Sequence, residues 1–333
     1  MPDFVSVLLK IAAMFLVMAL GWLVRRCHYV TDETSRSLSR LLVDMVFPAL
    51  VFTQMLRTVT PSVLREGWFL PILGVLLIVI AEIVGLGLIP LTRRKGKIAT
   101  AIFLVAMPNW VYLPLPIVEG LFGDAGVRDV LLYNVGCQVA LWSLGIWTLQ
   151  RGRFDAQSLK NLALNPGLLA TALGIGLALI CPPARHLEVL PGGSNPPLML
   201  AASAVIQALV MLGSLTIPLS LLVTGIHLGS LNLLIDRRPV HEFAGILTLR
   251  LLIAPAVTIA IIWLAGRAGL TLGEVPRLTA YIIACMPVAI SCSILTERFG
   301  GDTLLAARSV FYSTLWSILT VPAWYYLIRL WGL

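Results

Sequence analysis

The chain has 333 residues, of which 59% are hydrophobic and only 12% are charged. Soluble domains carry about twice that charged fraction, so the composition excludes a soluble globular domain. The net charge of +8 does not indicate nucleic-acid binding, because the basic residues lie in short segments between long apolar stretches, as they do in membrane proteins.

Repeated apolar stretches of about 20 residues predict an all-α polytopic membrane protein. The first stretch has neither a basic leader nor a small-residue cleavage site, so we expect a membrane span rather than a signal peptide. The second stretch contains Pro48 near its middle. In the first half of the chain, the predicted spans cover residues 4–24, 38–56, 68–91, 98–121 and 129–149.

The fourth span is interrupted near its middle by Pro108, Asn109, Pro114 and Pro116. Each proline lacks a backbone donor and crowds the carbonyl one turn back, and the residue before a proline favours extended geometry. We therefore expect two half-helices joined by an unwound strip at mid-membrane depth. In transporters such a strip marks the binding site, because lipid tolerates it only where it is enclosed in protein or lines a wet cavity. A proline kink without a ligand is the alternative.

A polar linker at residues 151–165 follows and is expected to be cytoplasmic. The seventh predicted span is interrupted by Pro218, and the ninth is interrupted by Pro287 and by the small polar residues from Ser291 to Ser293. The predicted spans of the second half cover residues 166–181, 198–228, 243–265, 277–297 and 303–330.

The two halves of the chain resemble each other. Spans two and seven each contain a proline, spans four and nine are both interrupted, and Leu-Trp-Ser-Leu at 141–144 corresponds to Leu-Trp-Ser-Ile at 315–318. Five spans per half would turn the second half the other way up in the membrane. Residues 1–150 and 166–333 are therefore predicted to form a ten-helix 5+5 inverted repeat whose broken helices cross. Chance placement of the prolines is the alternative.

Lys and Arg are concentrated in the odd-numbered loops between the predicted spans. Cytoplasmic loops carry an excess of these residues, so we expect the odd-numbered loops in the cytoplasm and both termini outside.

The interrupted fourth span resembles that of the auxin efflux carrier family. Pro108-Asn109 is followed by Pro116 at the family's spacing, although Pro114 stands where the family usually has glycine. Cys292 stands where plant PIN-type members have a second crossover proline. The other segments that resemble family motifs are residues 47–52, Gln138 with Trp142, 286–289 and 297–300. The resemblance covers nearly the whole chain, without the long cytoplasmic loop of many plant members, and so indicates a short bacterial-type member.

The resemblance implies a homodimer in the bacterial inner membrane. Helices 1, 2, 6 and 7 would form a scaffold, and helices 3–5 and 8–10 a mobile core that moves like an elevator. It also implies carboxylate substrates, which are auxin in plants and small dicarboxylates such as malate or malonate for some bacterial relatives. Three properties stay open: the particular carboxylate, the direction of transport, and the choice between proton coupling and uniport. The crossover of the two interrupted spans contains no acidic residue, which disfavours sodium coupling.

The residues of the two interruptions also agree with an anionic substrate. We expect the second half-helices to start near Pro116 and Cys292, where free N–H groups and partial positive charge attract a carboxylate. Asn109 can donate through its amide. Asn134 and Gln138 share a face of span five, and hydrogen bonding between helices is their alternative role. The predicted substrate-binding residues are Asn109, Pro116, Asn134, Gln138, Ser291 and Cys292.

Two charged side chains inside apolar spans form a separate prediction. Isolated charges within a bilayer are costly unless they pair or line a wet path. Glu82 in span three and Arg250 in span eight correspond under the inverted repeat, so we predict that they pair. A structural ion pair and a coupling role are both open.

The sequence also bears on functions other than that of a carrier. None of the four histidines shares a helical face with a carboxylate deep in a span, and no nucleotide-binding motif is present, so an intramembrane enzyme and an ATP-driven pump are disfavoured. A channel-like anion pore stays an alternative. The five cysteines have no metal-ligand spacing, and we expect no disulfide, metal, cofactor or nucleic-acid partner.

Overall fold

The computed structural model describes residues 4–91, 95–153, 156–187, 196–230, 241–270 and 272–332. Within these ranges the chain is helical, and its extended pairing is limited to an isolated antiparallel bridge between Pro108 and Val288. The all-α prediction is therefore confirmed. Six helical segments of the described chain are long and apolar enough to cross a membrane: Asp32–Thr58, Pro61–Ile89, Pro114–Leu149, Pro197–Ser230, Phe243–Arg267 and Thr303–Leu330.

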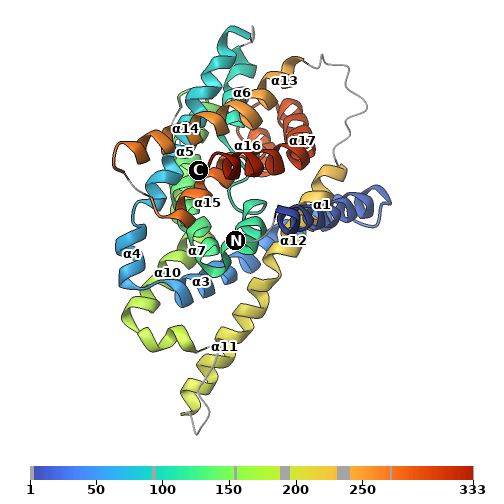
Figure 1. Cartoon of the computed structure of the whole chain (residues 1–333). Helices are drawn as coiled ribbons and strands as arrows, with labels where there is room; N and C mark the ends of the chain where they lie inside the picture. Colours follow the sequence, from blue (N-terminus) through green and yellow to red (C-terminus); the bar gives the residue numbers. More distant parts are fainter. Residues whose placement is uncertain are drawn as a thin grey trace.

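The elements of the two halves follow in chain order (Figure 1). The first half contains α1 (Phe4–Arg26), α2 (Asp32–Leu41), the π-helical turn η1 (Leu42–Val46), α3 (Phe47–Thr58), α4 (Pro61–Gly67), α5 (Leu70–Gly85), the 3-10 helix η2 (Leu86–Leu91), α6 (Lys95–Ala106), α7 (Pro114–Ala140), the π-helical turn η3 (Leu141–Gly145) and α8 (Ile146–Leu149). The linker between the halves contains α9 (Ala156–Ala163). The second half contains α10 (Pro166–Ile180), the 3-10 helix η4 (Pro182–His186), α11 (Pro197–Ser214), α12 (Thr216–Ser230), α13 (His241–Thr248), the π-helical turn η6 (Leu249–Ile253), α14 (Ala254–Arg267), α15 (Glu274–Ala284), α16 (Ser291–Arg298) and α17 (Thr303–Leu330).

Both predicted interruptions are present in the structure. Residues 107–113 separate α6 from α7, and residues 285–290 separate α15 from α16. A further bend lies inside α7 at Gly123, whose φ of +59° belongs to the left-handed region that glycine occupies at little cost. The predicted fourth and fifth spans are therefore joined by this bend rather than by a loop.

Two prolines are preceded by π-helical turns. The turn η1 ends two residues before Pro48, and η6 ends two residues before Pro255. A proline removes one backbone donor and pushes the preceding carbonyls outward, and a π-helical turn accommodates both effects without breaking the helix. The apolar segments around Pro48 and Pro255 thus remain long enough to cross a membrane.

The predicted interruption by Pro218 is present, and it lies in the turn before this proline. The chain leaves helical geometry at Leu215, between α11 and α12, and Pro218 lies in the first turn of α12. The first turn of a helix tolerates proline because its N–H groups have no intrahelical partner.

Glycines allow the principal helix pairs to approach closely. α1 packs along α12, α3 along α10, and α5 along α7; Figure 1 shows the first of these pairs side by side. A Cβ added to Gly136 on α7 would lie 1.7 Å from the Pro71 carbonyl oxygen on α5, and one added to Gly225 on α12 would lie 1.9 Å from the Met18 oxygen on α1. Membrane helices that meet through small residues gain backbone contact that larger residues would prevent.

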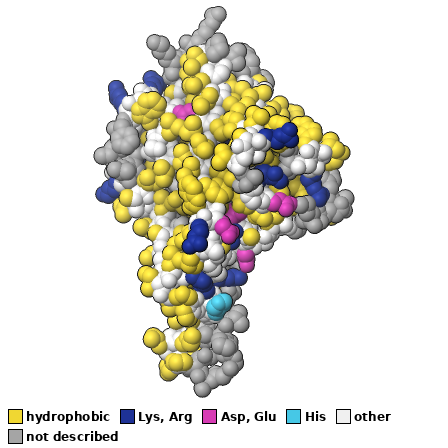
Figure 2. Space-filling view, turned by 60° about the vertical axis from the view of Figure 1, so that its left-hand side comes forward, with side chains coloured by type: hydrophobic (Ala, Val, Ile, Leu, Met, Phe, Trp, Pro, Cys, Tyr) yellow, Lys and Arg dark blue, Asp and Glu magenta, His cyan; other side chains and the backbone are white. Residues whose placement is uncertain are grey.

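The outer surface is mostly apolar. Figure 2 shows hydrophobic side chains over most of the visible face, with charged side chains in a few small groups. The N-terminal part of α11 projects away from the other helices (Figure 1), and Leu198 and Met211 on this helix are 83% and 72% exposed. Such a surface requires lipid or another protein chain to cover it.

The glycine contacts predict a difference between two otherwise similar substitutions. Gly136→Ala should cost about 1–3 kcal/mol of stability through overpacking, because a helix backbone lies where the methyl group would be. Gly176→Ala on α10 is the matched control, since nothing lies within 4 Å of its added Cβ, and it should leave the melting temperature unchanged or raise it. Thermal unfolding in detergent measures both, and equal melting temperatures would contradict the close contact of α5 with α7.

Candidate functional site

The two unwound strips meet and pair through their backbones. The N–H of Asn109 donates to the carbonyl of Pro287 at 2.8 Å, and the N–H of Ala289 donates to the carbonyl of Met107 at 3.0 Å. These bonds form the antiparallel bridge at the point where both helices are interrupted. Because unpaired backbone groups are costly away from water, each strip provides partners that the other needs.

Arg250 binds the ends of both broken helices. Its guanidinium donates to the carbonyl of Val105 at 3.0 Å, near the end of α6, and to the carbonyl of Ala284, at the end of α15. The side chain is 1% exposed. The last carbonyls of a helix lack intrahelical donors and carry partial negative charge, so a cation at that position satisfies them.

The predicted pair between Glu82 and Arg250 does not form. Glu82 instead accepts a hydrogen bond from the Thr148 hydroxyl on α8, and its second carboxylate oxygen is buried without a partner. The pairing was inferred from the correspondence of the two spans, which does not determine where the guanidinium points. The carbonyls of the interrupted helices compete for the same donors and are the observed partners of Arg250.

The start of α7 offers fewer backbone donors than we expected. This helix begins at Pro114, close to the predicted start near Pro116, and two of its first three residues, Pro114 and Pro116, have no N–H. Leu115, which lies between these two prolines, donates its N–H to the carbonyl of Val111 at 2.9 Å. At the start of α16, the N–H groups of Cys292 and Ser293 donate to nearby carbonyls at 3.0 and 3.1 Å. An anion at this crossing must therefore be bound mainly by side chains.

A cavity of about 280 Å³ lies against the paired strips. It is bounded by the strips themselves and by residues of α2, η1, α3, α7, η3, α12 and α16. Among the described residues that line it, none is Asp, Glu, Lys or Arg. Its polar lining consists of Ser39, Asn109, Trp110, Tyr112, Asn134, Gln138, Trp142, Asn165, Ser220, Thr224, His227 and Ser291.

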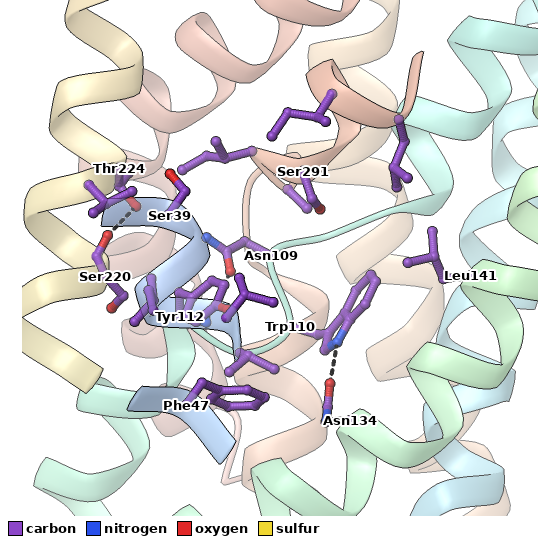
Figure 3. A pocket seen from close by; sticks show the side chains of 18 of the residues that line it. Ser39, Phe47, Asn109, Trp110, Tyr112, Asn134, Leu141, Ser220, Thr224 and Ser291 are labelled. Carbon is purple, nitrogen blue, oxygen red and sulfur yellow. Dashed lines mark hydrogen bonds between the residues drawn. The ribbon is translucent and has the colours of Figure 1, made fainter. Parts of the chain in front are cut away.

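Two asparagines that line this cavity have amide nitrogens without a hydrogen-bond partner in the described structure. The Asn109 side-chain oxygen accepts from the N–H of Tyr112 at 3.1 Å, which leaves its nitrogen available; Figure 3 shows that nitrogen pointing toward Ser39. The indole N–H of Trp110 donates to the Asn134 oxygen at 3.0 Å. An indole can only donate, so the Asn134 oxygen must face it, and the Asn134 nitrogen is buried without a partner.

The structure brings together four of the six predicted substrate-binding residues. Asn109, Asn134, Gln138 and Ser291 line the cavity. Pro116 and Cys292 are absent from the described lining; Pro116 lies within the first turn of α7, and Cys292 is 1% exposed, with its sulfur 4.0 Å from the Met107 carbonyl oxygen.

The cavity also contains side chains that the sequence analysis did not select. Ser39 on α2 and Ser220, Thr224 and His227 on α12 line one side of it, although their helices are far from both interruptions in the sequence. The three residues of α12 recur at intervals of four and three, so they share one helix face. That polar face in an apolar segment was the signal available from the sequence.

A cavity between paired, interrupted membrane helices is typical of membrane carriers. The profile of the family described as "Membrane transport protein" matches residues 6–325. The chain therefore belongs to this family, and the predicted resemblance to the auxin efflux carriers is confirmed.

Relatives over the whole length are also transporters by name. The chain is 23% identical to an "Uncharacterized transporter" of Methanothermobacter thermautotrophicus, over 94% of this chain and 96% of the relative. It is 23% identical to an "Uncharacterized transporter" of Methanocaldococcus jannaschii, over 93% and 94%. It is 24% identical to a "Putative malonate transporter" of Rhizobium meliloti, over 93% and 92%.

The contacts of Arg250 predict a large effect of its removal on stability. Arg250→Met leaves two buried carbonyls without their donor and should cost on the order of 3 kcal/mol. Arg250→Lys should be intermediate, because a single ammonium cannot reproduce the planar fork of the guanidinium. The control is Arg267→Met on α14, where an exposed guanidinium lies over the Trp263 ring and contributes less than about 1 kcal/mol. If the Arg250 and Arg267 variants have the same melting temperature, Arg250 does not stabilise the ends of α6 and α15 as its hydrogen bonds indicate.

Proposed function

We propose that this protein is a secondary transporter of small organic anions, with carboxylates as its substrates, and that it works by alternating access. The observation that carries the proposal is the cavity at the paired strips, which is lined by Asn109 and Asn134. The Asn109 amide nitrogen has no partner in the described structure, and the Asn134 amide nitrogen is buried without one. Amide donors are suited to carboxylate oxygens, and an unsatisfied buried donor gains a hydrogen bond when a ligand arrives.

The chemistry of the lining favours an anion over a cation. The described lining has no carboxylate that could bind a cation, whereas its amides and its histidine can all donate hydrogen bonds. A volume of about 280 Å³ suits a compact ligand. The relative named for malonate, which is a small dicarboxylate, supports the same substrate class for this chain.

The helix contacts support the proposed 5+5 inverted repeat of residues 1–150 and 166–333, with the linker 151–165 between them. In such a repeat, the packing of α1 on α12 corresponds to the packing of α10 on α3, and both contacts are present. The packing of α7 on α15 corresponds to that of α17 on α6, and both of these are present as well. An arrangement with ten spans, crossed broken helices and elevator-like movement of the crossed part is consistent with this pattern.

We also propose a homodimer in a bacterial inner membrane with both termini outside. The exposed apolar side chains of α11, including Leu198 and Met211, offer a surface that a second copy could cover. The orientation rests on the distribution of Lys and Arg among the loops.

A substitution at Asn109 tests the proposed site. Asn109→Asp keeps an oxygen that accepts from the N–H of Tyr112, but it replaces the donor nitrogen with an oxygen that repels an anion. We expect the purified variant to fold and to lose the thermal stabilisation that malonate and related carboxylates give the parent protein. Asn109→Ala should lose it too. Asn161→Asp on α9, outside the cavity lining, is the matched control and should bind as the parent does.

Transport assays complete this test. Uptake into proteoliposomes should saturate and show counterflow, which a channel-like pore would not show. Normal carboxylate binding by both Asn109 variants would place the site elsewhere, and the absence of stabilisation by any carboxylate in the parent would contradict the proposed substrate class.

A further inference from the structure

We propose that His227 is a substrate-binding residue that holds the carboxylate only in its protonated form, so that each anion enters the cavity together with one proton. This inference rests on the proposed function and specifies how the same site is coupled. It concerns the side of the cavity formed by Ser39, Ser220, Thr224 and His227, which we call the α2–α12 wall. Figure 3 shows Ser39, Ser220 and Thr224 of this wall facing Asn109, with Trp110 and Asn134 beyond it.

The hydroxyl groups of the α2–α12 wall donate their hydrogens to backbone carbonyls. Ser39 donates to the Ser35 carbonyl at 2.8 Å, Ser220 to the Ile217 carbonyl at 2.8 Å, and Thr224 to the Ser220 carbonyl at 2.7 Å. A hydroxyl has one hydrogen, so these three oxygens face the cavity as acceptors only. His227 is therefore the side chain of this wall that can donate to an anion.

The same hydrogen bonds determine which nitrogen of His227 takes up a proton. Its Nε2 lies 2.9 Å from the Ser39 hydroxyl oxygen. With its hydrogen donated to the Ser35 carbonyl, the Ser39 hydroxyl acts as an acceptor here, and the His227 tautomer that fits this bond carries its hydrogen on Nε2. In the neutral ring Nδ1 then has the lone pair. Protonation at Nδ1 adds a positive charge and a donor without breaking the bond to Ser39.

An anion in this cavity needs such a charge. The amides of Asn109 and Asn134 are neutral, and no described residue of the lining carries a permanent positive charge. Burying a carboxylate with hydrogen bonds alone leaves its charge uncompensated, which is costly in a region of low dielectric constant. Of the described side chains that line the cavity, His227 is the one that can gain a positive charge by taking up a proton, so it can supply the missing charge at the expense of one proton from solution.

The ionisable groups around His227 come from the helices packed against α12. α12 contacts α1, α2, η1 and α11. α11 has no ionisable side chain, and the described ones on the other three elements are Arg25, Arg26, Asp32, Glu33, Arg36, Arg40 and Asp44. Of these, Arg25 is close enough to act on the imidazole electrostatically, and it forms an ion pair with Asp32. Tyr112 is the other titratable side chain of the cavity lining.

The test compares pH dependence in matched variants. The affinity for malonate is measured by calorimetry from about pH 8 to about pH 5, and the proton uptake that accompanies binding is obtained by repeating the titration in buffers of different ionisation enthalpy. His227→Gln can still donate to Ser39 but cannot be protonated. His186→Gln, at an exposed position on η4, is the control. Because malonate titrates identically in every sample, differences between variants report on the protein.

The parent and His186→Gln should bind more tightly as the pH falls, by up to about tenfold per pH unit, and should take up close to one proton per anion at neutral pH. His227→Gln should bind with a shallower pH dependence and a correspondingly smaller proton uptake, and its affinity at low pH should fall at least tenfold below that of the parent. His227→Lys, which keeps a positive charge across this range, should also lose most of the pH dependence.

Two results would overturn the inference. If His227→Gln keeps the pH dependence and proton uptake of the parent, His227 has only a structural bond to Ser39; loss of both in Glu82→Gln would then assign the proton to the buried Glu82 instead. If the parent shows no proton uptake beyond that of malonate itself, binding is not proton-coupled. In either case Asn109→Ala still tests the proposed function independently, because it removes the amide donor without adding a titratable group and should abolish carboxylate binding at every pH if that function holds.

Discussion

Unwound backbone in the middle of a membrane protein is stable only when its polar groups have partners, and this requirement organises the molecule. The strips at 107–113 and 285–290 supply partners to each other, as the bonds between Asn109 and Pro287 and between Ala289 and Met107 show. Arg250 supplies the donors that the carbonyl ends of α6 and α15 lack. The two interruptions are therefore mutually dependent, because neither broken helix would have its exposed backbone satisfied without the other.

This arrangement determines the chemistry of the cavity. Arg250 lies at the carbonyl ends of the broken helices, where its charge is used internally, and the prolines at the start of α7 leave few free N–H groups. Binding capacity is left to side chains beside the strips, above all the amide nitrogens of Asn109 and Asn134. Such a site can recognise the oxygens of a carboxylate, but it does not by itself neutralise the carboxylate charge. The proposed role of His227 is to supply the positive charge that the amides lack.

The surrounding helices position the two sides of the cavity differently. The wall that contains His227 belongs to α12, which is held against α1 by close contacts at Gly225. Asn134 belongs to α7, which is held against α5 by the contact of Gly136 with Pro71. The cavity thus lies between two separately packed groups of helices. A ligand that contacts both groups would respond to any movement of one relative to the other, which is the property that alternating access requires.

Local sequence pattern was sufficient for the all-helical class and for both interruptions, because apolar length and the missing donor of proline act within a few residues. It failed wherever the outcome depended on which distant groups meet. Arg250 was assigned to Glu82, but the carbonyls it satisfies come from segments 145 and 34 residues away. His227 was set aside because no carboxylate shares its helix face, yet its relevant neighbour is Ser39, 188 residues away. Only tertiary packing brings such groups within hydrogen-bonding distance, since hydrogen bonds depend on position in space to a few tenths of an ångström.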